Sequence, residues 1–148
     1  MRRTLFVLHV LTSAVFLGAV TALLALVVAA DPATDPGGFA ALMPAQPALV
    51  DWLLLPGLAL SVVTGLAVLL YKVELLERRW LLIKLCLTVL AAGIALGNLM
   101  SAAYRLPGTV GAAAATLAEG AAALAAAVLL LLVAIYVLSI IRPRLGGR

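Results

Sequence analysis

Two ionisable side chains that could do chemistry lie inside long apolar stretches of the sequence. His9 falls in the stretch that begins near Thr4, and Lys84 falls in the stretch that begins at Trp80. An ionisable group among membrane-type apolar residues is costly, which makes it a candidate functional residue. A histidine there can accept a proton or ligate a metal or a haem iron. We therefore select His9 and Lys84 as the candidate cofactor-binding residues.

A simpler interpretation stays open for both residues. The Lys84 side chain can reach the lipid headgroups, and the His9 ring can hydrogen-bond to a neighbouring helix. Depth favours a shared polar layer, because both lie about four residues into their stretches and a helix rises ~1.5 Å per residue. Thr64 and Tyr136 fall at a comparable depth. We predict that His9 faces the protein close to Lys84, since an unpartnered imidazole N–H in hydrocarbon is costly.

The elements that hold these residues are predicted to be membrane-spanning helices. Apolar residues make up 66% of the 148 residues and charged residues 11%, so polar groups cannot cover the apolar surface in water. A span needs about 20 mostly apolar residues, and a long apolar run in lipid must be helical. Four stretches qualify, at about residues 4–30, 49–71, 80–104 and 113–141.

The first stretch also resembles a secretory signal peptide, with Arg2 and Arg3 ahead of an apolar run. That run extends from Leu5 to Ala30, well beyond the roughly 7–15 apolar residues of a signal peptide. We expect it to be retained as the first span. Residues 1–148 then form a single all-α transmembrane domain.

Basic residues predict the orientation of the spans, because positively charged loops favour the cytoplasmic side. One side of the predicted bundle carries most of the basic residues, while the other carries Arg105 alone. We predict that both termini are cytoplasmic and that residues 31–47 lie on the opposite side. The net charge of +4 is spread over helix ends, which argues against a nucleic-acid partner. The basic residues on the predicted cytoplasmic side are Arg2, Arg3, Lys72, Arg78, Arg79, Arg142, Arg144 and Arg148.

Short loops predict an up-down-up-down four-helix bundle, and small residues recur at four-residue spacing along three of its spans. Small side chains let helix backbones approach closely in lipid. We expect these stripes to pack inside the bundle, so that leucine at Gly93 or Gly97 would destabilise it; alternatively, one stripe faces another subunit. Asn98 is expected to hydrogen-bond across helices. The stripes are Ala14, Gly18 and Ala22; Gly57, Ser61 and Gly65; and Gly93, Gly97 and Ser101.

The remaining residue types disfavour several classes of protein. One histidine and one cysteine with scattered acids cannot supply the three or four ligands of a zinc site, so no metal site is assigned. The sequence has no phosphate-binding glycine loop, nucleophile elbow or HExxH motif, so no catalytic residue is assigned. No span carries the row of acids expected of an ion pathway, which makes a small transporter the least favoured class.

Short motifs over residues 5–98 resemble bacterial membrane proteins. The first-helix and third-helix motifs are similar to CopD-like and HemJ-like proteins. The second-helix motifs are similar to an uncharacterised bacterial four-helix family of "predicted integral membrane proteins", which shares the third-helix motif. The motifs are Leu8–Leu11 with Gly18 in the first helix; Asp51-Trp52, Pro56-Gly57 and Thr64-Gly65 in the second; and Trp80–Leu85 in the third.

The resemblance implies a role for the two candidate residues. HemJ-like proteins are haem-associated oxidases of protoporphyrinogen that depend on a first-helix histidine and a third-helix lysine, and His9 and Lys84 match these positions. Ala29–Pro32 departs from the basic and aromatic residues expected there, and Asn98 stands where HemJ-like proteins carry further histidines. CopD-like proteins are longer and have a copper route that this sequence lacks. The resemblance therefore favours the uncharacterised family, and it implies haem or copper chemistry as the two possibilities, with haem as the candidate cofactor.

These observations lead to one expected function and two alternatives. We expect a multi-pass protein of the bacterial inner membrane that is not an enzyme. It would pack in the lipid bilayer against a second copy or a larger membrane complex, with a small apolar or haem-like molecule as its candidate ligand. The first alternative is a HemJ-like haem-dependent oxidoreductase that acts on protoporphyrinogen. The second is a small transporter.

Overall fold

The computed structural model describes residues 2–70 and 79–141, and this part of the chain is almost entirely helical. The charged stretch 71–78 and the basic end 142–148 carry much of the predicted charge asymmetry, and both lie outside the described residues.

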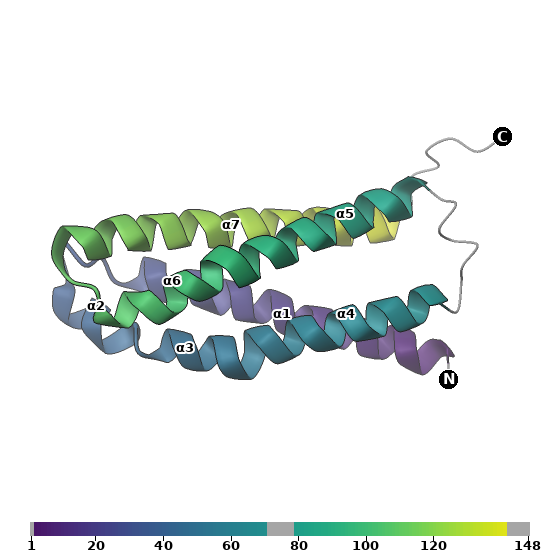
Figure 1. The fold of residues 1–148 in the computed structure, drawn as a ribbon, viewed down its shortest axis with the longest axis horizontal. Coiled ribbons are helices and arrows are strands. Elements are labelled where there is room, and N and C mark those ends of the chain that lie inside the picture. Colours follow the sequence, from purple (N-terminus) through teal and green to yellow (C-terminus); the bar gives the residue numbers. More distant parts are fainter. Residues whose placement is uncertain (1, 71–78, 142–148) are drawn as a thin grey trace.

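Within the described ranges, four helical segments are long and apolar enough to cross a membrane. Consecutive long segments run in opposite directions (Figure 1). The chain is therefore an all-helical bundle of a kind that suits a multi-pass membrane protein. The segments are α1 (Arg2–Ala29); α3 (Ala45–Leu49) with the π-helix η1 (Val50–Leu54) and α4 (Leu55–Leu70); α5 (Arg79–Ile94) with the π-helix η3 (Ala95–Leu99) and α6 (Met100–Arg105); and α7 (Gly111–Ile141).

One end of the bundle is covered by the connections between the long helices. The short helix α2 (Pro36–Leu42) begins at Asp35, whose carboxylate accepts a hydrogen bond from the Gly38 N–H at 2.9 Å. Its Phe39 side chain is buried against the ends of the long helices. The 3-10 turn η4 (Leu106–Gly108) closes the same end. We call this the capped end, and the end near residues 2, 70 and 79 the terminal end (Figure 1).

The π-helix η1 ends two residues before Pro56. A proline has no N–H for the carbonyl four residues earlier, and its ring crowds that carbonyl. The wider π turn accommodates this, because the Leu55 N–H bonds to the Val50 carbonyl five residues before it. Pro56 thus sets the backbone of the second span at this level without ending the helix.

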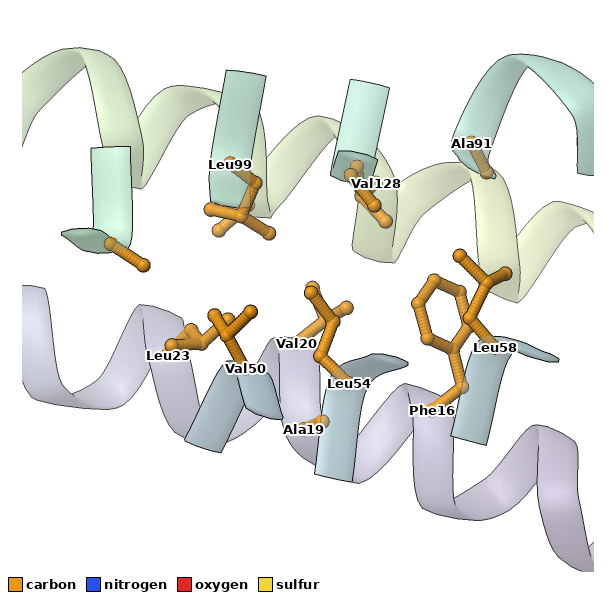
Figure 2. Packing of buried hydrophobic residues seen from close by; sticks show 13 residues of the cluster. Phe16, Ala19, Val20, Leu23, Val50, Leu54, Leu58, Ala91, Leu99 and Val128 are labelled. Atoms are coloured by element: carbon orange, nitrogen blue, oxygen red, sulfur yellow. The ribbon is translucent and has the colours of Figure 1, made fainter. Parts of the chain in front are cut away.

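The apolar core lies in the middle and the capped part of the bundle. Helix α1 packs against α4 and α7, and α5 packs against α7. Figure 2 shows Phe16, Val20 and Leu54 facing Leu99 and Val128 across the bundle. Among the described side chains, the last buried apolar ones toward the terminal end are Phe16, Leu58, Ala91 and Val128. Beyond this layer, the buried side chains of the described part are the polar Thr12 and Thr64.

Candidate functional site

The His9 ring lies between α1 and α4 in the terminal half of the bundle. Its Nδ1 atom is 3.0 Å from the Ser61 carbonyl oxygen and 3.2 Å from the Thr64 hydroxyl. A carbonyl oxygen can only accept a hydrogen bond, so Nδ1 must carry the proton and donate it. The contact therefore fixes the tautomer of the neutral ring and leaves the lone pair on Nε2.

The Nε2 atom of His9 forms no hydrogen bond with any described residue. The ring is only partly buried, and no fully buried side-chain nitrogen or oxygen of the described part lacks a hydrogen-bond partner, so Nε2 has accessible surface. An imidazole held by Nδ1–H on a backbone carbonyl, with Nε2 open, is the arrangement of a metal-ligating histidine and its supporting shell. The ring is thus held through Nδ1, and its Nε2 has no partner among the described residues.

Gly65 makes room for this ring. A Cβ atom at position 65 would lie 3.0 Å from Cε1 and 3.3 Å from Nδ1 of His9. Both distances are shorter than ordinary contacts, so even an alanine would press on the imidazole. The ring therefore rests against the backbone of α4, which explains why this glycine follows the buried Thr64.

A short series of hydroxyl groups extends from His9 toward the core. The Thr12 and Thr64 hydroxyl oxygens are 3.4 Å apart, and those of Ser13 and Ser61 are 2.7 Å apart. Thr64 also donates to the Leu60 carbonyl within its own helix at 2.6 Å. These contacts join α1 to α4 where their interface has few buried apolar groups. The series stops at the buried Phe16.

Lys84 lies on α5 and is partly buried. Helix α5 begins at the terminal end, so Lys84 lies in the same half of the bundle as His9. No hydrogen bond joins the two side chains among the described residues. The prediction that His9 and Lys84 hold one ligand together stays a prediction.

Two sequence-based expectations about polar residues are wrong. Tyr136 does not join the predicted polar layer, because its side chain is 63% exposed on α7. Asn98 forms no hydrogen bond with another helix among the described residues, and its side chain is exposed on η3. Both errors concern rotation about the helix axis, which depth along a span does not determine. The Ser61 carbonyl was missed because a backbone acceptor leaves no mark in the sequence.

The small-residue stripes behave differently on the second and third spans. On α4, a Cβ at Gly57 would lie 3.1 Å from the Phe16 backbone nitrogen, so the prediction of close packing is confirmed there. On the third span, Gly93 and Gly97 are exposed and have no atom within 4 Å of a built Cβ. The prediction that leucine at either position would destabilise the bundle by clashing is therefore wrong for this chain alone, since the stripe faces away from the other helices.

The described residues contain no group of three or more histidine, cysteine, aspartate or glutamate side chains that could hold a metal ion. The comparisons supply no relative for this site, since no family model, curated protein or solved structure matches the chain. The chemistry of the site therefore has to be argued from its own atoms.

Proposed function

We propose that this chain is a non-enzymatic module of the bacterial inner membrane that binds a haem-like ligand through His9. The observation that carries the proposal is the fixed ring. Its Nδ1–H is held by the Ser61 carbonyl at 3.0 Å, while Nε2 has no partner among the described residues. A histidine that served only to join two helices would need no accessible second nitrogen. Both termini are proposed to be cytoplasmic, which places His9 in the inner leaflet.

The chemical groups of His9 and Lys84 are of the types that a haem-like ligand requires. His9 would offer an imidazole nitrogen, and the Lys84 amine would offer a cation for a carboxylate on the ligand. Exposed apolar side chains occur near both residues in the sequence, among them Phe6, three residues before His9, and Leu82, two residues before Lys84. When bound, haem would supply an iron centre that accepts the Nε2 lone pair. The chain's own part is to hold and orient the imidazole and to balance the charge of the ligand.

Haem titration of the full chain in detergent micelles tests this proposal. The Soret band of added haem should shift and sharpen with wild-type protein at about one haem per chain. His9→Ala should lose this change, because the imidazole is the single proposed ligand from the described residues. Thr88→Ala is a matched control, since its hydroxyl bonds only within α5, to the Lys84 carbonyl at 2.9 Å. No spectral change with wild-type protein, or equal binding by His9→Ala, would exclude the proposal.

A haem-dependent oxidoreductase of the HemJ type is a second candidate, favoured by the placement of His9 and Lys84 in the same half of the bundle. This candidate predicts that the haem-loaded protein converts protoporphyrinogen to fluorescent protoporphyrin faster than air alone. Lys84→Met should abolish that rate and spare most haem binding. A rate equal to that of haem in empty micelles would exclude the enzyme and leave the binding module intact.

The proposed orientation has its own test. Single cysteines at positions 40 and 75, in a Cys86→Ser background, should react differently with a membrane-impermeant thiol reagent added outside intact cells. Position 40 should be labelled and position 75 protected, because the basic loops are proposed to be cytoplasmic. The reverse pattern would invert the proposed topology without touching the His9 chemistry.

A further inference from the structure

The third span changes its neighbours between the two ends of the bundle. In the capped half, α6 packs against α3 of the second span, whereas in the terminal half α5 packs against α7. Among the described residues, neither α1 nor α4 packs against α5 to a comparable extent. Figure 1 shows α4 and α5 separating toward the terminal end. The terminal half therefore contains two helix pairs, which we call the α1–α4 pair and the α5–α7 pair.

Buried side chains connect the helices within one of these pairs and do not connect the two pairs. Thr12 and Thr64 are buried between α1 and α4, with their hydroxyl oxygens 3.4 Å apart. In contrast, no residue of 81–90 on α5 or 129–139 on α7 is buried, over about 15 Å along each helix. The side-chain hydrogen bonds of these two stretches, among the described residues, stay within their own helices. Partly buried side chains alone therefore join the two pairs there.

A π turn interrupts the third span next to the stretch that lacks buried side chains. In η3, which follows the end of α5 at Ile94, the Met100 N–H bonds to the Ala95 carbonyl five residues before it. The nearest proline is Pro107 in η4, so a proline does not account for this turn as Pro56 accounts for η1. Helices bend at π turns, which are frequent at functional sites. The η3 turn thus provides a point at which α5 can bend relative to the capped half.

The two candidate ligand-binding residues lie on different pairs. His9 belongs to the α1–α4 pair, because its Nδ1 atom is held by the Ser61 carbonyl of α4 at 3.0 Å. Lys84 is partly buried on α5 and belongs to the α5–α7 pair. A ligand that contacts both residues would therefore connect two pairs that buried side chains do not connect.

We propose that the α5–α7 pair moves relative to the α1–α4 pair in the ligand-free protein, and that the ligand holds the two pairs in one arrangement. This inference rests on the proposed function, because the ligand is the one bound through His9. A ligand shifts such an equilibrium only if it binds one arrangement more tightly than the others. It must therefore carry two separate groups, a metal centre for the His9 imidazole and a carboxylate for the Lys84 amine.

Pulsed electron paramagnetic resonance between two spin labels on the full chain in detergent micelles tests the movement. In a Cys86→Ser background, Leu70→Cys on α4 and Leu82→Cys on α5 place labels at exposed positions of the two pairs. Their distance distribution should be broad without ligand. Val7→Cys with Leu70→Cys is the matched control, because Val7 is exposed on α1 and both labels then lie on the α1–α4 pair. The control distribution should be narrow, and equal widths for the two label pairs would overturn the proposal.

Addition of zinc protoporphyrin, whose binding is followed separately by its absorption band, tests the effect of the ligand. It should narrow the distribution between the Leu70→Cys and Leu82→Cys labels to about the width of the control. The dimethyl ester of the same porphyrin should leave the distribution broad when bound, because its esters offer no anion to Lys84. Lys84→Met should likewise keep it broad with the free acid bound.

The outcomes separate this inference from the proposed function. Bound zinc protoporphyrin with an unchanged distribution, or equal narrowing by the dimethyl ester, would overturn the inference and leave ligand binding through His9 intact. If neither porphyrin bound, the proposed function and the inference would fail together.

Discussion

The capped and terminal halves of this bundle are held together by different interactions. In the capped half, alanines such as Ala103 and Ala121 are almost fully buried between the helices. In the terminal half, α1 and α4 meet through His9, Thr12 and Thr64, and the described part has no buried apolar side chain there. Close packing stabilises the first half, whereas hydrogen bonds and one glycine hold the second.

This difference has a physical reason. Lipid tails are as apolar as leucine, so burying apolar surface gives helices in a membrane little drive to associate. Dense packing of small residues and hydrogen bonds between helices supply it instead. The capped half is held mainly by dense packing of small side chains. The terminal half is held mainly by hydrogen bonds, and Nε2 of His9 has no partner there among the described residues.

The largest effect is expected where the two halves meet, at Gly57. Its Cβ position is 3.1 Å from the backbone nitrogen of Phe16 and 3.2 Å from the Val15 side chain, so a leucine there must push α1 away from α4. Gly57→Leu should lower the free energy of unfolding by about 1–3 kcal/mol or more. Thermal unfolding in detergent, followed by circular dichroism, measures the loss.

Gly18→Leu is the control for Gly57→Leu, because Gly18 is exposed on α1 and has no atom within 4 Å of its Cβ position. It should unfold at the wild-type temperature. If the two leucine variants unfolded alike, the close packing of α1 on α4 could not be what stabilises this layer.

A second expected effect separates ligand binding from stability. Valine at Gly65 would displace the His9 ring from the Ser61 carbonyl, because a Cβ there already lies 3.0 Å from Cε1. Loss of such a supporting contact typically lowers ligand affinity about 10–100-fold. Gly65→Val should therefore weaken haem binding by that factor in a Soret titration. Gly93→Val is the control, because Gly93 lies on an exposed face with open space, and it should bind haem as the wild-type protein does. Equal haem affinities of the Gly65→Val and Gly93→Val variants would show that the His9 ring needs no support from α4.

The smallest effect is expected at Thr64. Thr64→Val removes the hydroxyl that contacts His9 at 3.2 Å and Thr12 at 3.4 Å while keeping the shape of the side chain. A hydrogen bond between membrane helices contributes about 0.6 kcal/mol on average, so the stability should fall by that amount. Thr88→Val, whose hydroxyl bonds within its own helix, should cost less. A larger loss at position 88 would contradict a structural role for the Thr12–Thr64 contact.

The sequence was sufficient to predict an all-helical chain with four long apolar segments, because apolar run length is a strong signal in membrane proteins. It also indicated that Gly57 and Gly65 face protein. It misplaced Gly93, Gly97, Asn98 and Tyr136, since the spans are apolar all round and carry no contrast that reveals which face is inside. The hydrogen bond from His9 to Ser61 could not be predicted, because every residue has a carbonyl.

The most direct test of the central claim is the protonation pattern of the single histidine of this chain. Nitrogen-15 NMR of protein labelled only in histidine would show one ring with two nitrogen signals. The structure predicts a protonated Nδ1 and an unprotonated Nε2 at neutral pH, and the Nε2 signal should shift strongly on addition of diamagnetic zinc protoporphyrin. A protonated Nε2, or signals that do not respond to the porphyrin, would contradict the proposal that His9 is held open for a ligand.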